Sequence, residues 1–214
     1  MTASRATDGE ERAERPAATG PRRGRAIPPR DLELRVTLAL IDPPIWRLVR
    51  VPDHYTLHQL HRVFQLLFGW LDYHLYDFTI GERRFEAPDP EAEGENSTKA
   101  RLRDFGFEAG DRFTCRYDWG DDWDHDVVVE SVHDAEFLAD EPRLPLLLGG
   151  ARAGPHEDAG GPSAYGEMVK ALRNKRHSGH RMYRDWAGPL YDPERFDPWL
   201  AGQNLTLAAA WGAI

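Results

Sequence analysis

The sequence predicts an α+β fold, in which an antiparallel sheet opens strand-strand-helix-strand and is covered on one face by helices, with further helices at the C-terminus. Two observations carry this prediction. Apolar residues alternate with polar ones in several short stretches, which is typical of half-buried strands, and an amphipathic helix follows the second of them. The order of strands and then helices favours α+β over a parallel α/β arrangement.

The first two strands form a predicted hairpin. Residues 32–40 alternate strictly, with leucine or valine at every second position. Asp42-Pro43-Pro44 breaks this pattern, and residues 45–51 (IWRLVRV) are rich in branched and aromatic side chains. We expect the second stretch to pair with the first.

The clearest helix is predicted to begin after Thr56 and to end at Gly69. Thr56 and Gln59 form a capping-box pattern, in which each side chain binds a free amide at the helix start. Leucine and phenylalanine residues then recur on one stripe, and glycine suits the left-handed position that ends a helix.

The remaining elements follow from shorter patterns. Residues 74–80 predict a strand, and 83–85 its partner after a turn; 88–99 is an acidic surface loop. Residues 112–119 and 124–132 predict a hairpin whose tip is the acidic stretch around Gly120–Trp123. Helical spacing then appears at Tyr165–Leu172, around Met182 and Trp186, and after Pro198.

Composition restricts the class of protein. Residues 1–30 are rich in Ala, Arg, Pro and Gly and predict a disordered tail, followed by one domain over 31–212. The net charge is −9, which disfavours a dedicated nucleic-acid-binding domain, so a protein or small-molecule partner is the stronger expectation. Cys115 is the single cysteine, which excludes an internal disulfide and a multi-cysteine zinc site. With no secretory or membrane segment in the sequence, we expect a cytoplasmic protein with no membrane contact.

Six motifs, in this order, resemble one known family, the plasmid pRiA4b ORF-3-like proteins, some of which are passengers in insertion elements. The motifs are PPIWRLVRVP (43–52), TLHQLHRVFQLLFGW (56–70), HLYDF (74–78), YDWGDDWDHDVVVE (117–130), GGARAGPHEDAGGP (149–162) and YDPERFD (191–197). The resemblance implies an uncharacterised accessory or binding protein associated with mobile elements. Many relatives carry cysteines in the Gly-rich motif, where this chain has Leu147, Gly154 and Ala159. Any activity kept here therefore cannot depend on thiolates.

An alternative is a metal-dependent hydrolase. Its candidate ligands or catalytic residues are the histidines and acids at motif positions: His74, Asp118, Asp121, His125, Glu157 and Asp158. Imidazole and carboxylate groups suit a divalent metal, which lowers the pKa of bound water. His61 also occupies a motif position and is kept as a possible contributor.

Structural explanations compete with this hypothesis. In an extended strand His125 points away from Asp124 and Asp126, and a buried histidine satisfied by one acid would explain it. Glycines in 149–162 could serve turns that bring Arg152 against Glu157 and Asp158 as an ion-pair lock, or the same loop could floor a ligand pocket.

Two tryptophans flank the acidic turn. Trp119 and Trp123 would be partly exposed at a hairpin tip and could bind a cation, a sugar or a basic peptide. The alternative is that both rings fold back to cover the sheet edge.

Overall fold

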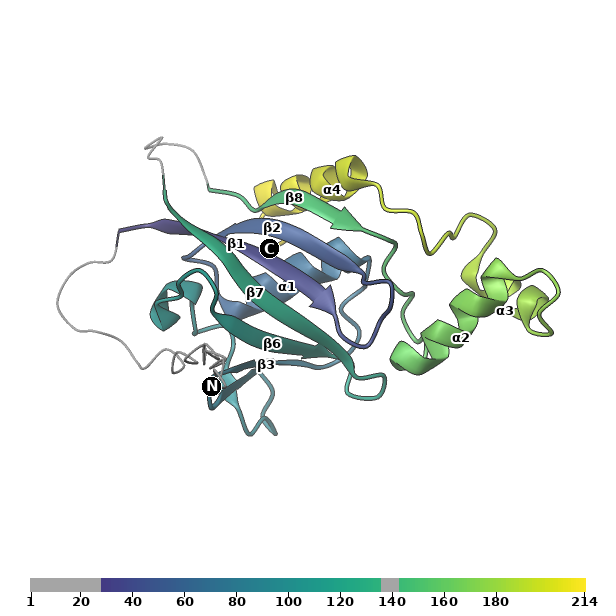
Figure 1. Cartoon of the computed structure of the whole chain (residues 1–214). Helices are drawn as coiled ribbons and strands as arrows, with labels where there is room; N and C mark the ends of the chain where they lie inside the picture. The colour runs from purple at the N-terminus through teal and green to yellow at the C-terminus, as the bar shows by residue number, and fades with distance from the viewer. Residues whose placement is uncertain (1–27, 136–142) are drawn as a thin grey trace, which may run out of the picture.

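The computed structural model describes residues 28–135 and 143–214, which form one curved sheet with helices around it (Figure 1). The predicted tail lies almost entirely outside the described residues. The eight strands are β1 (Arg30–Leu38), β2 (Trp46–Pro52), β3 (Tyr76–Ile80), β4 (Arg83–Glu86), β5 (Glu95–Asn96), β6 (Arg112–Tyr117), β7 (Trp123–Asp134) and β8 (Leu146–Ala151). The helices are α1 (Leu57–Phe68), a short 3₁₀ turn η1 (Leu102–Phe105), α2 (Gly161–Arg173), α3 (His180–Ala187) and α4 (Pro198–Ala210).

The sheet has the order β5-β4-β3-β6-β7-β1-β2-β8. Its strand pairs are antiparallel except β4 with β5, and the chain opens strand-strand-helix-strand as predicted. The α+β prediction is therefore confirmed. None of the helices in the described residues is long and apolar enough to cross a membrane.

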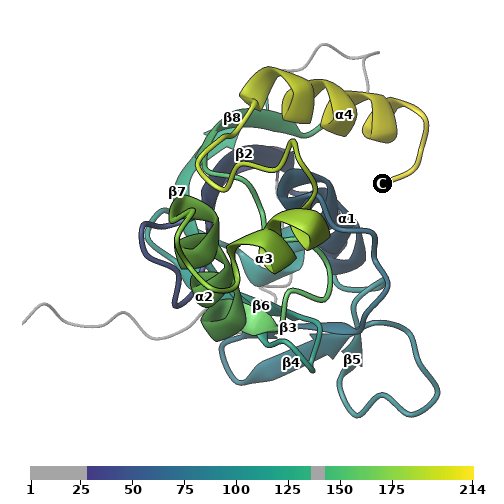
Figure 2. The ribbon, with the colours of Figure 1, turned by 90° about the vertical axis from the view of Figure 1, so that its right-hand side faces the viewer.

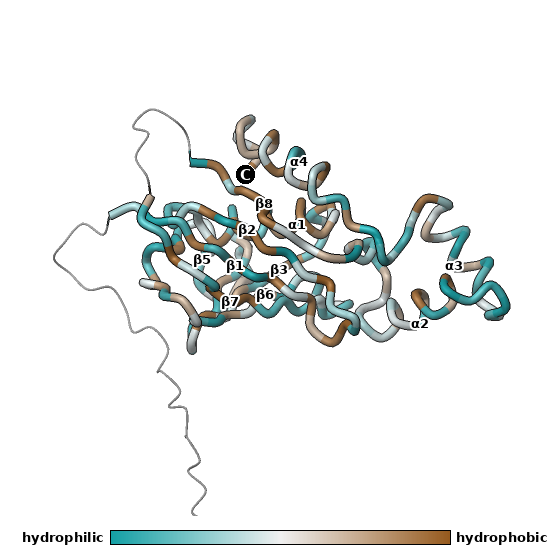
Figure 3. Tube along the Cα trace, turned by 45° about the horizontal axis from the view of Figure 1, so that its top comes forward, coloured by the Kyte–Doolittle hydropathy of each residue, from teal (hydrophilic) through white to brown (hydrophobic). Residues whose placement is uncertain are grey.

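The core lies between the sheet and α1. On β1 the side chains of Leu32, Leu34, Val36 and Leu38 are buried, as the period of two predicts. Figure 2 shows the sheet curving around α1, while α4 lies along the β8 edge. Figure 3 shows hydrophobic segments on the strands and a mostly hydrophilic α3 region. Helices α2 and α3 lie beyond one end of the sheet, beside the hairpin tip (Figure 1).

Helix α1 has the ends that the sequence predicts. Thr56 and Gln59 form both hydrogen bonds of the capping box, and Gly69 adopts φ 83°, the left-handed value that glycine tolerates. A buried guanidinium then fixes the C-terminal end of the helix. Arg47 Nε donates to the Leu67 carbonyl at 2.8 Å, and Nη1 donates to the Ala151 carbonyl of β8 at 2.9 Å. Burial lowers the Arg47 pKa to about 9.

Two features of the sheet differ from the predictions. Strand β8 was not expected, because Gly149 and Gly150 suggested a loop, yet both pair with β2. The acidic loop contains the two-residue strand β5. The β6–β7 hairpin is confirmed, with a tip at 118–122 in which Asp118 and Asp122 have positive φ.

Candidate functional site

Three segments meet at the end of the β6–β7 hairpin. They are 71–75, which leads into β3; the hairpin tip 118–122; and the loop 152–160 between β8 and α2. A backbone hydrogen bond joins the first two, because Asp118 N donates to the Leu75 carbonyl at 2.9 Å, and Tyr73 N donates to the side-chain hydroxyl of Tyr117 at the end of β6 at 3.1 Å. The first contact extends the β3–β6 ladder and brings His74 beside Asp118.

The third segment is anchored at several points. Trp70 Nε1 donates to the Pro155 carbonyl at 2.9 Å, and the Tyr191 hydroxyl donates to the Gly154 carbonyl at 3.1 Å. Gly154 packs against the end of α1 so closely that a Cβ there would lie 2.0 Å from the Phe68 carbonyl oxygen. Only glycine fits this approach, which holds the loop against the helix.

Asp118 is oriented by its own turn. Its Oδ1 accepts from the backbone N–H of Gly120 at 2.9 Å and of Asp121 at 3.3 Å. Its Oδ2 lies 3.6 Å from His74 Nε2. The protein therefore satisfies one carboxylate oxygen and leaves the other facing the imidazole.

The two carboxylate oxygens of Glu157 also have different partners. Its Oε1 accepts from Leu71 N at 2.6 Å and from the Tyr117 hydroxyl at 2.9 Å, while its Oε2 lies 3.9 Å from His74 Nε2. Burial, followed by the bond to Glu157, raises the Tyr117 pKa, so the phenol keeps its proton and acts as a donor. Sequence reasoning missed Tyr117 as a site residue, because its alternation in β6 indicated only a core position.

Asp158 completes the group from the solvent side. It has φ 56°, its side chain is 75% exposed, and its Oδ1 lies 3.3 Å from His74 Nε2. Ligand atoms of His74, Asp118 and Asp158 all lie within 4.8 Å of one another. We call His74, Asp118, Glu157 and Asp158 the His74 cluster.

The cluster brings three carboxylate oxygens around one imidazole nitrogen. His74 Nε2 is buried yet has no hydrogen-bond partner, although three carboxylates surround it. Donors bound to one divalent metal at about 2.0–2.2 Å lie about 3.0–3.5 Å apart. Of the three distances from His74 Nε2, 3.3 Å to Asp158 lies within that range, while 3.6 Å to Asp118 and 3.9 Å to Glu157 lie above it, and all three are longer than a typical hydrogen bond. One nitrogen and three carboxylate oxygens suit manganese, iron or zinc.

Arginine does not neutralise these carboxylates. In the described part of the chain, the ion pairs of Asp118, Glu157 and Asp158 are all with His74. Arg152 pairs instead with Glu194 at 2.9 Å. The expected lock between Arg152 and Glu157 or Asp158 is therefore wrong.

Two sequence candidates lie outside the cluster. The Asp121 carboxylate accepts from Gly160 N at 2.8 Å, so Asp121 ties the hairpin tip to the loop behind the cluster. His125 is fully buried among Phe64, Phe68 and Trp70, and its Nδ1 contacts the Cys115 carbonyl at 3.1 Å. His125 is thus a core residue, held by a carbonyl and aromatic rings rather than by an acid.

The acid-paired histidine of the core is His61. Its Nε2 lies 2.7 Å from Asp72 Oδ1, and its ring stacks on Tyr76 with centroids 3.6 Å apart. Burial lowers the His61 pKa, while the Asp72 contact opposes that shift. The contact with Asp72 explains the motif position of His61 without a ligand, while the other ring nitrogen, Nδ1, is buried and has no hydrogen-bond partner among the described residues.

The two tryptophans at the hairpin have different environments. Trp119 is 43% exposed, and the Arg84 guanidinium lies 4.9 Å from its ring centroid. Trp123 begins β7 and is buried, so its expected exposure is wrong. Leu71, Tyr73 and Leu75 are also exposed, and they place apolar side chains on the segment that carries His74.

Comparisons with known proteins place these motifs in one family. The family model for plasmid pRiA4b ORF-3-like proteins matches residues 30–199. The chain is 34% identical over 164 residues to the uncharacterized protein y4hQ of Sinorhizobium fredii (strain NBRC 101917 / NGR234), covering 73% of this chain and 80% of that protein. It also resembles the crystal structure of MM3350, a protein of unknown function from Methanosarcina mazei Go1. The TM-score is 0.72 at 31% identity, covering 81% of this chain and 98% of the other.

Proposed function

Because this chain belongs to the plasmid pRiA4b ORF-3-like family, whose two relatives above are described as uncharacterized and of unknown function, we propose its function from the site itself. The proposal is a divalent-metal-dependent hydrolase that uses the His74 cluster. One observation carries it: Asp118 and Glu157 each have one oxygen bound by protein donors and the other turned toward the unpartnered Nε2 of His74.

The cluster has features that a metal centre needs. The largely buried carboxylates of Asp118 and Glu157 are oriented by backbone and phenol donors, an arrangement that fixes ligands before a metal binds. Asp158 is largely exposed, which gives a route from solvent and room for a water ligand. A bound metal would supply a water molecule of lowered pKa for attack on an ester or amide.

The first test is metal binding. Protein freed of metal with a chelator is titrated with Mn²⁺ and with Zn²⁺ by calorimetry, in the wild type and in Asp118→Asn. We expect one site per chain whose affinity falls at least ~100-fold in the variant, since loss of a ligand should exceed the roughly 10–100-fold effect of outer partners. Asp126→Asn is the matched control, because Asp126 is exposed on the same hairpin. Equal binding in all three proteins would refute the site.

The second test is chemistry. Phosphoester and amide model substrates are incubated with metal-loaded protein, and we expect turnover that chelation abolishes and added metal restores. Binding without turnover on any of these substrates would remove the hydrolase assignment and leave a metal-binding protein.

A second candidate is a binding protein, which the exposed apolar residues around the cluster favour. Leu71, Tyr73, Leu75 and Trp119 are each more than 40% exposed. An accessory role with mobile elements, in the cytoplasm, belongs to this alternative. Protection of 71–75 and of 117–121 from hydrogen exchange on adding a basic peptide, lost in Trp119→Ala, would support it over the enzyme.

A further inference from the structure

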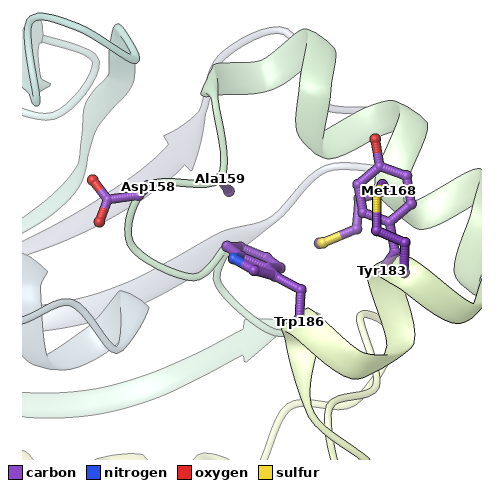
Figure 4. Close-up of a pocket in the computed structure, with 6 residues that line it drawn as sticks. Asp158, Ala159, Met168, Tyr183 and Trp186 are labelled. Carbon is purple, nitrogen blue, oxygen red and sulfur yellow. The ribbon is translucent and has the colours of Figure 1, made fainter. Parts of the chain in front are cut away.

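A pocket of about 190 Å³ opens beside the loop that carries the cluster (Figure 4). One wall is the loop, and the others come from α2 and α3. The lining residues are Asp158, Ala159, Met168, Met182, Tyr183 and Trp186.

The pocket exists because the apolar face of α3 is incompletely covered. Met182, Tyr183 and Trp186 share one face of this helix, since residues three and four apart are neighbours. Within α3 the buried residue is Ala187, whereas Met182 and Trp186 are 60% and 49% exposed. Opposite them, Met168 of α2 forms a buried floor, and Ala159 offers only a methyl group.

From this geometry we propose that the pocket binds a small molecule carrying an aromatic ring with a hydrogen-bond acceptor beside it. A cavity of about 150 Å³ lined by apolar side chains is known to hold benzene, so this pocket accommodates a ring and a short substituent. Methionine sulfur and aromatic faces both favour an aromatic guest over an aliphatic one. The Trp186 ring makes an edge contact with His156, with centroids 5.6 Å apart, and within residues 28–135 and 143–214 its indole N–H makes no hydrogen bond, so that N–H is available to a ligand.

This site goes beyond the proposed hydrolase and does not depend on it. The Asp158 carboxylate faces His74 Nε2 at 3.3 Å and points away from the pocket in Figure 4. The His74 cluster and the pocket therefore lie on opposite sides of the same backbone. A ligand in the pocket would contact the loop that carries Asp158, which is itself a lining residue.

The experiment uses the scarcity of methionine. The chain has three methionines, Met1, Met168 and Met182, so protein labelled with ¹³C at the methionine methyl groups gives three signals. The probe is benzyl alcohol, added to chelator-treated protein so that the result is independent of any metal. We expect saturable ring-current shifts at Met168 and Met182 and none at Met1, with a Kd of ~1 mM, as for a fragment of this size. Assignments come from Met168→Leu and Met182→Leu.

Two variants make the test decisive. Ala159→Leu fills the pocket and should weaken benzyl alcohol at least ~10-fold, while Trp199→Ala removes an exposed tryptophan on α4 and should change nothing. Circular dichroism and thermal unfolding check that both variants fold. Shifts that are linear up to the solubility limit, that include Met1 equally, or that persist in Ala159→Leu would overturn the proposal. Should Ala159→Leu fail to fold, Trp186→Leu replaces it with the same expected loss.

Discussion

Two histidines of this molecule face carboxylates in opposite ways. In the core, His61 has one acid at hydrogen-bond distance, with Nε2 2.7 Å from Asp72, and an aromatic ring stacked on its face. At the end of the sheet, His74 has three carboxylates at 3.3–3.9 Å and a hydrogen bond to none of them. We call the His61–Asp72 pair closed, because its two side chains are hydrogen-bonded to each other. We call the His74 cluster open, because its carboxylates surround the imidazole nitrogen without bonding to it.

The difference lies in what holds the acids. Within the described residues the Asp72 carboxylate has one hydrogen bond, which is the 2.7 Å contact with His61 Nε2. Asp118 and Glu157 are held from behind by backbone N–H groups and a phenol, which stops them closing on His74. Carboxylates fixed around one point repel one another, and a cation among them offsets that repulsion. The contrast thus separates a structural histidine from a candidate ligand.

The largest expected effect is on metal affinity. His74→Ala should remove Mn²⁺ binding beyond detection, because it deletes the one nitrogen ligand and the residue that all three carboxylates face. Asp72→Asn, the equivalent change at the closed pair, should leave the Mn²⁺ affinity within about 2-fold and lower the free energy of unfolding by about 1–2 kcal/mol. Calorimetry and urea unfolding measure the two quantities. A weaker Mn²⁺ affinity in Asp72→Asn than in His74→Ala would mean that the His61–Asp72 pair binds the metal and that the His74 cluster does not.

A third histidine extends the comparison to stability. His125 has no carboxylate partner, and burial lowers its pKa to about 4 from an ordinary 6.5. Between these values the unfolded chain binds a proton that the folded chain does not, so stability rises with pH and is fully present above about pH 6.5. On acidification to pH 4 this group should cost about 3 kcal/mol, from a shift of about 2.5 units at 1.36 kcal/mol each.

The check is urea unfolding at several pH values for the wild type and His125→Leu. The variant should lose less stability than the wild type between pH 6.5 and 4, whatever its stability at pH 7. Parallel pH profiles for the two proteins would show that His125 does not titrate as its burial requires.

The next prediction tests whether Asp121 belongs to the cluster, through its effect on Mn²⁺ affinity. The Asp121 side chain contacts no member of the cluster and instead accepts from Gly160 N, although the Asp121 backbone N–H donates to Asp118 Oδ1. Asp121→Ala should weaken Mn²⁺ about 10–100-fold, the range found for residues behind metal ligands. Asp121→Asn keeps an oxygen acceptor and should restore most of that loss. If the asparagine variant binds as poorly as the alanine variant, the charge of Asp121 acts on the metal directly and the residue belongs inside the cluster.

The sequence predicted the elements better than the site, for physical reasons. Alternation and capping are local, so β1, β2, α1 and the β6–β7 hairpin could be predicted from it. Strand β8 was missed because its glycines carry no side-chain pattern. The alternation in β7 could also have predicted that Trp123 and His125 are buried. Both lie on the same face of the strand as the buried Val127, because residues two apart in a strand share a face.

Which motif acids meet could not be read from spacing. Asp118, Asp121, Glu157 and Asp158 are all at motif positions, yet three face His74 and one turns to Gly160. That choice depends on the positive φ of Asp118 and on the anchoring of the 152–160 loop to Phe68 and Trp70. These contacts join segments far apart in the chain, and no local rule encodes them.

The smallest expected effect concerns the donors behind Glu157. Tyr117→Phe removes the hydroxyl that donates to Oε1, while Leu71 N still holds the same oxygen at 2.6 Å. We expect a 2–5-fold loss of Mn²⁺ affinity, because Leu71 N keeps the same carboxylate oxygen in place, so only part of the roughly 1.5–3 kcal/mol of a hydrogen bond to a charged group is lost. Phe64→Leu, a core change on the neighbouring helix, is the control for general loosening. A loss for Tyr117→Phe as large as that for Asp121→Ala would mean that Glu157 swings toward His74 without the phenol. The Tyr117 hydroxyl would then be the group that keeps Glu157 from hydrogen-bonding to His74. In that case this one hydroxyl would account for the difference between the His74 cluster and the hydrogen-bonded His61–Asp72 pair.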